Sequence, residues 1–154
     1  MVGRGISVKW PVGREADGYG NMGRMVKQTP NSIGYVGSIY AQQNRLPYAQ
    51  VQNAATNFTS ADPVSIGAAA VAGAKAIPSD FRSAITNPQG VESYPISTYI
   101  WILISKKGST KQESMKDFLR WALNEGQTYV EPTGFARLPP EVVEEELKAL
   151  AEVR

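Results

Sequence analysis

The order of the elements predicted for residues 6–36 constrains the fold of this chain more than any other feature. A β-prone run is followed by a glycine-rich loop, an amphipathic segment that begins at Asn21 and stops at Pro30, and a second β-prone run at 33–36. Strand, loop, helix and strand in this order predict a βαβ unit, which builds parallel sheets. The two runs and the loop between them read ISVKW, PVGREADGYG and IGYV.

The glycine-rich loop suggests one kind of ligand. Gly13, Gly18 and Gly20 lie in it, and it leads directly into the predicted helix. Such a loop presents unpaired backbone N–H groups and the positive end of the helix dipole, which together favour an anion. Glycine-rich turns also occur as plain connections between a strand and a helix. The residues alone leave both readings open.

Length and composition indicate a globular domain. The chain has 154 residues, 42% of them apolar and 19% charged, which is enough to bury a core. The net charge is only +2, and the basic residues are scattered along the sequence. No basic stripe with interleaved aromatic residues is present, so the sequence predicts no nucleic-acid partner.

The chain contains neither cysteine nor histidine. Disulfides, zinc sites with Cys or His ligands, a Cys nucleophile and triads with an imidazole base are therefore excluded. The acidic run at 144–146 is predicted on a solvated helix face, with no base or nucleophile beside it. We therefore expect no enzyme activity, no catalytic residue, no metal and no cofactor.

No targeting or membrane-spanning segment is predicted. The first residues carry neither an apolar region nor a small-residue cleavage site, so we expect no signal peptide. The longest apolar run, 100–104, is far too short to cross a bilayer.

Periodicity and breaker residues predict the remaining elements. The run 96–105 reads ISTYIWILIS and is near-continuously apolar from Tyr99 to Ile104, which predicts a strand buried on both faces. The other elements expected are a helix at 38–46, a strand at 48–52, an irregular polar stretch at 53–60, an alanine-rich packing helix at 64–76, a turn-rich stretch at 77–95, and a closing helix at 141–153. The helix at 64–76 is predicted to be capped by Asp62, with Pro63 at its first position.

An amphipathic helix is predicted after the 96–105 strand. Ser109 or Thr110 is its expected cap, and Gly126 follows its end. One stripe of this helix is predicted to be core, and it consists of Met115, Phe118, Leu119, Ala122 and Leu123.

Several of these stretches together resemble the second half of the phosphate-binding proteins of bacterial phosphate ABC importers. The resemblance covers nearly the whole chain in order. It is carried by KWPVG at 9–13, GN at 20–21, VKQTP at 26–30, SIGYV at 32–36, YAQQN at 40–44, TN at 86–87, YPIS at 94–97, ILI at 102–104, DF at 117–118, WA at 121–122, EGQ at 125–127, LP at 138–139 and VV at 142–143.

The resemblance implies an α/β fold: a partial periplasmic-binding-protein-like lobe, with short βα units and a C-terminal strand, helix and helix. Residues 1–93 resemble part of the second lobe, and residues 94–154 the segment that returns to the first lobe. It also implies inorganic phosphate as ligand, a transporter permease as partner and a periplasmic or extracytoplasmic location. The phosphate ligands of such proteins lie mainly in the half that this chain does not match.

One loop resembles the family's own arginine loop, which reads Arg-Ala-Asp-Gly-Ser-Gly-Thr. Ala16, Asp17, Gly18 and Gly20 match it. Glu15 stands in place of the arginine, Tyr19 in place of the serine and Asn21 in place of the threonine, and the two carboxylates oppose an oxyanion. The phosphate-binding residues expected in this chain are Arg14, Asp17, Gly18, Gly20 and Asn21.

The resemblance implies that this chain matches only about half of a two-lobed protein, so part of a sheet would be missing. The 99–104 strand would keep an open apolar face or edge unless something covers it. We therefore expect either a homodimer with a swapped or shared sheet, or pairing with a separate N-terminal half. Two functions remain open: a phosphate-binding component of an importer, or its C-terminal half; and an oligomerising structural fragment that lacks the ligands and binds no phosphate.

Overall fold

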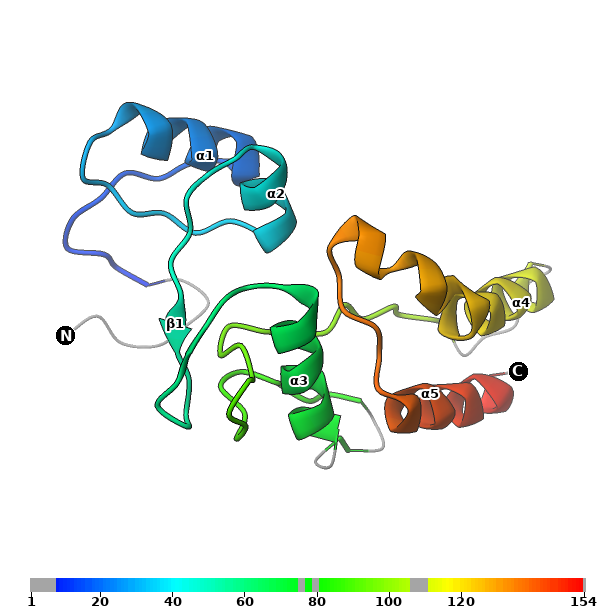
Figure 1. Cartoon of the computed structure of the whole chain (residues 1–154). Coiled ribbons are helices and arrows are strands. Elements are labelled where there is room, and N and C mark those ends of the chain that lie inside the picture. The colour runs from blue at the N-terminus through cyan, green and yellow to red at the C-terminus, as the bar shows by residue number, and fades with distance from the viewer. Residues whose placement is uncertain (1–7, 75–76, 79–80, 106–110, 154) are drawn as a thin grey trace. The chain divides into compact units, whose positions relative to one another are not determined.

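The computed structural model describes residues 8–74, 77–78, 81–105 and 111–153. Within these residues it contains five α-helices, two 3-10 helices and one two-stranded sheet (Figure 1). The chain divides into two compact units, Met1–Tyr48 and Ala49–Arg154, which we call the N-unit and the C-unit. Each helix that the structure describes is too short or too polar to cross a membrane.

In the N-unit, two helices pack together through a glycine. They are α1 (Gly18–Gln28) and α2 (Ser38–Gln43), and α1 begins three residues before the predicted Asn21. Gly23 of α1 is buried, and a Cβ atom added there would lie 2.8 Å from Cε1 of Tyr40 and 3.2 Å from Cδ1 of Leu46. Only glycine therefore allows the Tyr40 ring to approach α1 this closely.

The prediction of a strand at 33–36 is wrong. These residues form no strand in the structure, and Ile33 and Tyr35 are 93% and 78% exposed. Gly34 lies against α1, because a Cβ atom there would be 2.7 Å from Cγ2 of Val26. A strand needs a neighbour for its backbone groups, and the described part of the N-unit supplies none. In the earlier β-prone run, residues 6–7 lie outside the described residues and 8–10 form no strand.

The C-unit begins with a short hairpin. Strands β1 (Val51–Gln52) and β2 (Phe58–Thr59) pair antiparallel, with Val51 opposite Thr59. The strand predicted at 48–52 is thus confirmed in its last two residues. The second strand was not predicted, because the polar composition of residues 53–60 indicated irregular structure.

The side chain of Asn53 joins this hairpin to a distant loop. It is 5% exposed, and its Oδ1 accepts hydrogen bonds from the backbone N–H groups of Ala55 and Asn57, each at 3.0 Å. Its Nδ2 donates to three carbonyl oxygens, those of Gly90 at 3.1 Å, Val91 at 2.9 Å and Ser93 at 3.1 Å. One buried amide therefore fixes both the hairpin turn and the 90–93 loop.

Helix α3 (Pro63–Ala74) begins as the sequence predicts. The backbone N–H of Ser65 donates to Oδ1 of Asp62 at 2.9 Å, so Asp62 caps the helix and Pro63 occupies its first position. Ala69 and Ala70 are buried, which confirms a packing helix on that face, whereas Val71 on another face is 54% exposed. The small alanine side chains let neighbouring backbone approach closely.

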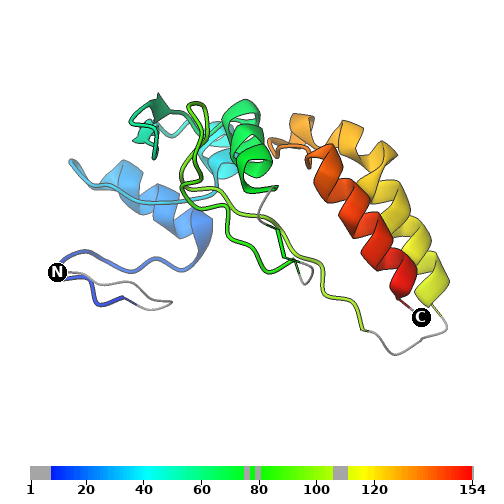
Figure 2. The same cartoon turned by 90° about the horizontal axis from the view of Figure 1, so that it is seen from below.

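The prediction of a strand at 96–105 is also wrong. Residues 96–105 form no strand, and Ile100 and Leu103 are 74% and 95% exposed instead of buried (Figure 2, yellow-green). The apolar run is present, but no described segment pairs with it. The expected two-face burial required neighbours that the described residues do not provide.

Helices α4 (Gln112–Leu123) and α5 (Pro140–Glu152) lie side by side in Figures 1 and 2. Leu119, Val142 and Leu150 are buried, and Nζ of Lys116 donates to the carbonyl of Val153 at 2.7 Å, at the end of α5. Two 3-10 helices connect the pair, η1 (Glu125–Tyr129) and η2 (Glu131–Thr133).

The predicted stripe of α4 is core only in part. Leu119 is buried, but Phe118 is 59% exposed. The cap predicted at Ser109 or Thr110 lies outside the described residues, and Gly126 is buried within η1. The described residues are helix-rich with a two-stranded sheet, so the α/β detail of the expected fold class, with its βα units of a parallel sheet, is not confirmed.

Candidate functional site

Four of the five predicted site residues lie at the start of α1. Asp17 immediately precedes the helix with φ −85° and ψ 111°, and its side chain makes no capping hydrogen bond. Gly18 follows with φ +73°, in the left-handed region that favours glycine. Gly20 and Asn21 complete the first turn. The N–H groups of this turn therefore have no side-chain cap and point outward from the positive end of the helix dipole.

The side chain of Asn21 is occupied within the helix. Its Nδ2 donates to the carbonyl of Asp17 at 2.9 Å, and its Oδ1 accepts from Nη2 of Arg24 at 3.0 Å. Asn21 thus stabilises the first turn, and one of the two N–H groups of its amide is used in doing so.

Arg14 and the acidic residues of the loop are exposed. Arg14 forms no hydrogen bond or ion pair with any residue in the described part of the chain. Glu15 and Asp17 flank the turn, and each opposes an anion by about 1 kcal/mol at partly exposed distances. Anion binding at this loop therefore stays a prediction, with Arg14 as the cation that the sequence places there.

A second, basic hollow lies beside the same turn and was missed by the sequence analysis. It measures about 210 Å³ and is lined in part by Gly20, Arg24, Lys27 and the Tyr40 ring. Nζ of Lys27 donates to the carbonyl of Asn44 at 3.0 Å, so the Lys27 side chain also contacts the C-terminal end of α2. The spacing of two basic residues three apart in a helix was the available signal, but only the packing of α2 makes the hollow.

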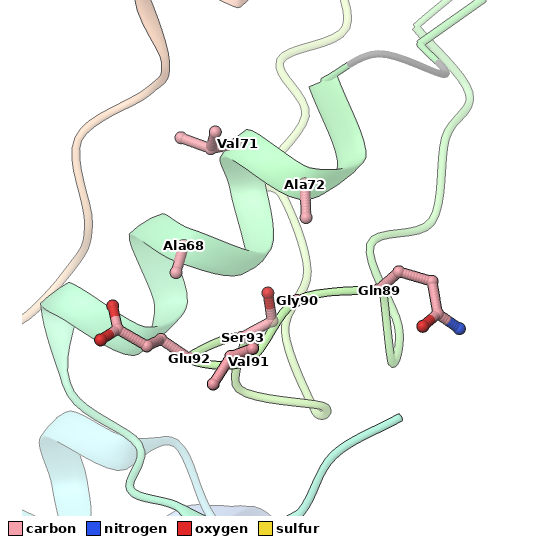
Figure 3. Close-up of a pocket in the computed structure, with 8 residues that line it drawn as sticks. All are labelled: Ala68, Val71, Ala72, Gln89, Gly90, Val91, Glu92 and Ser93. Carbon is pink, nitrogen blue, oxygen red and sulfur yellow. The ribbon is translucent and has the colours of Figure 1, made fainter. Parts of the chain in front are cut away.

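The larger hollow, in the C-unit, is unsuited to an anion. Its volume is about 650 Å³, and Figure 3 shows it between α3 and the loop at 89–93. Ala68, Val71 and Ala72 line one side, while the loop contributes Glu92 and no lysine or arginine. A carboxylate without a neighbouring cation disfavours a negatively charged ligand.

Titratable groups with shifted pKa values have structural causes. Burial raises the pKa of Tyr94, Tyr99 and Glu146. Hydrogen bonds to Glu145 and then Glu144 raise the pKa of Lys148. Among the described residues no group of three or more acidic side chains is placed to hold a metal ion.

Comparisons with known proteins decide which family the chain resembles. Across 94% of its length it is 34% identical to the "Phosphate-binding protein PstS" of Xylella fastidiosa strain 9a5c. The chain is similar to phosphate-binding proteins. It is also 32% identical to the protein of that name from Pasteurella multocida and 33% identical to the one from Methanocaldococcus jannaschii. No family model matches the chain.

The resemblance to phosphate-binding proteins predicted from the sequence is thereby confirmed. The chain spans only about two-fifths of the length of these relatives: 40% of the Xylella protein and 43% of the Methanocaldococcus protein. That the matched part is the C-terminal half, and that residues 93 and 94 mark a boundary between lobes, stay predictions.

Proposed function

We propose that this chain is part of the phosphate-binding component of an ABC importer and acts without catalysis on the extracytoplasmic side of a membrane. The observation that carries the proposal is the similarity to phosphate-binding proteins over 94% of the chain. The transporter permease is its partner in this proposal. The alternative of a structural fragment that binds no phosphate has no support from the names of the relatives.

Within this chain, the proposed contact for phosphate is the start of α1. The uncapped first turn, with Gly18 and Gly20, offers backbone N–H donors, and Arg14 offers an unpaired cation. The carboxylate of Asp17 can accept a hydrogen bond from a protonated phosphate oxygen, which sulfate does not carry at neutral pH. This arrangement favours phosphate over sulfate.

Calorimetric titration with phosphate and with sulfate tests the proposal. Since the proposed contact uses the single cation of Arg14, we expect a dissociation constant in the range of about 1 mM for phosphate, or about −4 kcal/mol, and weaker binding of sulfate. Arg14→Gln should abolish the heat, and Asp17→Asn should remove the preference for phosphate. Arg45→Gln, which removes a charge of the same unit outside the 14–21 stretch, is the control.

The absence of heat with either anion, in the chain alone and in the chain supplemented with the rest of a relative, would contradict the proposed function. Retention of phosphate binding by Arg14→Gln would instead move the contact away from this turn.

A further inference from the structure

The N-unit carries a surplus of positive charge. Its sequence has six basic and two acidic residues, a side-chain charge of +4, whereas the C-unit has ten basic and twelve acidic residues. Both acidic residues of the N-unit, Glu15 and Asp17, precede α1. Residues 18–48 therefore contain no carboxylate side chain, and their three cations are Arg24, Lys27 and Arg45. A surface with one sign of charge attracts ligands of the opposite sign.

Two of these cations lie on one face of α1, beside the basic hollow. Arg24 and Lys27 are three residues apart, so their side chains are neighbours on the helix surface. Like charges at this spacing repel each other and destabilise a helix. The helix dipole favours Lys27 in the last turn, but it gives no reason for Arg24 in the middle of α1. An anion bound between the two side chains would relieve their repulsion.

Neither charge is neutralised by a described residue. Nη2 of Arg24 donates to Oδ1 of Asn21 at 3.0 Å, and Nζ of Lys27 donates to the carbonyl of Asn44 at 3.0 Å. Both acceptors are uncharged, and neither cation forms an ion pair with any residue that the structure describes. A guanidinium has five N–H donors and an ammonium has three, so these bonds position the cations and leave most of their donors for a ligand.

The ring of Tyr40 forms an aromatic wall of the hollow. A Cβ atom added at Gly23 would lie 2.8 Å from Cε1 of the ring and 3.3 Å from its hydroxyl, and one added at Gly20 would lie 4.0 Å from the hydroxyl. The ring therefore lies across these two glycines, on the side of α1 that carries the two cations. Its hydroxyl makes no hydrogen bond with any described residue, so it is a further donor at the hollow.

The rest of the lining suits a small ligand with both a polar and an apolar part. Gln28 and Asn44 contribute amides, the buried Leu46 contributes an apolar side chain, and no acidic residue lines the hollow. The volume of about 210 Å³ is roughly seven times the ~30 Å³ that a water molecule occupies in the liquid. A phosphate group has five heavy atoms, so a short organic group fits beside it.

We propose that the basic hollow binds a phosphate monoester, with the phosphate group between Arg24 and Lys27 and the organic group on the Tyr40 ring. A phosphate monoester carries a charge of about −1.5 to −2 at pH 7, which matches two cations, whereas a carboxylate matches only one. The guanidinium fork of Arg24 can donate to two phosphate oxygens at once. The inference does not depend on the proposed function, because the contact proposed there uses the cation of Arg14 instead.

Calorimetric titrations of the chain with phenyl phosphate, methyl phosphate and inorganic phosphate test the inference. Phenyl phosphate should bind at least fivefold more tightly than methyl phosphate, because only the phenyl group can cover the Tyr40 ring. Arg24→Gln and Lys27→Gln should each weaken phenyl phosphate binding about tenfold. Arg24→Lys, which keeps the charge but loses the fork, should weaken it about threefold.

Lys9→Gln is the matched control, since it removes an exposed positive charge of the same unit that does not line the hollow. It should change the affinity for phenyl phosphate less than twofold. A loss as large as that of Lys27→Gln would show that net charge attracts the ligand without a site, and would overturn the inference.

A second measurement separates binding from folding. Arg24 is exposed, so Arg24→Gln should leave the circular dichroism of the chain unchanged. Phenyl phosphate should shift the nuclear magnetic resonances of the Tyr40 ring protons in the unmodified chain, and much less in Arg24→Gln. Unchanged Tyr40 resonances, or phenyl phosphate that binds no more tightly than methyl phosphate, would overturn the inference. Loss of phenyl phosphate binding in Arg14→Gln alone would also overturn it, because the ligand would then lie at the start of α1.

Discussion

At the scale of single residues, Asn53 has the largest predicted effect on stability. Its buried amide makes five hydrogen bonds to backbone groups on either side of a long sequence gap. Asn53→Ala leaves those groups unsatisfied and should lower the free energy of unfolding by about 3 kcal/mol. Asn53→Asp should cost more, because a carboxylate oxygen would then face three carbonyl oxygens.

Urea unfolding followed by circular dichroism measures both changes. Asn57→Ala is the matched control, since Asn57 is exposed and, among the described residues, its Nδ2 donates to the carbonyl of Ala55 alone. A cost for Asn53→Ala as small as that of the control would show that the amide does not hold the two loops together.

The half-buried Glu146 gives the chain a pH dependence. Burial raises its folded-state pKa above the ordinary value of 4.5, so its contribution to stability is present below that value and is lost as the pH rises through the folded pKa. Glu146→Gln should therefore raise the unfolding temperature at pH 7, by on the order of 1 °C. The gain should disappear near pH 4.

The acidic run at 144–146 was predicted on a solvated face, which holds for Glu144 and Glu145 but not for Glu146. Glu144→Gln is thus the control: it removes an exposed carboxylate 2.9 Å from Lys148 and should give no gain. Thermal unfolding at pH 7 and pH 4 separates the two variants, and equal shifts in both would refute the assigned burial effect.

At the scale of elements, the two interior glycines of α3 should respond in opposite ways to alanine. A Cβ atom at Gly67 meets only Cβ of Ala136 at 3.8 Å, so Gly67→Ala should stabilise the chain by about 1 kcal/mol of helix propensity. A Cβ atom at Gly73 would clash with Cγ2 of the buried Ile85, so Gly73→Ala should destabilise the chain by about 1–3 kcal/mol.

Chemical denaturation of the two variants side by side is sufficient, because the substitution is the same and lies in the same helix. Stabilisation by Gly73→Ala would mean that Ile85 does not pack against α3. The sequence gives both glycines the same propensity cost, and only the position of Ile85 distinguishes them.

At the scale of the whole molecule, the uncovered apolar residues of the C-unit should bind a hydrophobic dye in the native state. We expect the native chain to enhance the fluorescence of anilinonaphthalene sulfonate. The double variant Ile100→Lys/Leu103→Lys should lower this signal without changing the helical circular dichroism. Dye fluorescence that is unchanged in the double variant would place the exposed apolar surface elsewhere.

The candidate site was predicted in part. Asp17, Gly18, Gly20 and Asn21 meet at the start of α1 because they are neighbours in sequence, and a glycine-rich loop before an amphipathic segment is a local signal. The basic hollow at Arg24 and Lys27 was not predicted, because its other side comes from α2. The five hydrogen bonds of Asn53 likewise could not be predicted, because three of them join residues more than 35 positions apart in the sequence.

The sequence by itself determined the helices and the resemblance to phosphate-binding proteins. A helix closes its hydrogen bonds within four residues, so spacing, the Asp62 cap and the proline breakers were enough to locate α1, α3 and α5. Only the tertiary structure decided the strands. A strand closes its hydrogen bonds with a neighbour, and the described residues offer none to 33–36 or 96–105, so most of the large apolar side chains of these β-prone runs remain exposed.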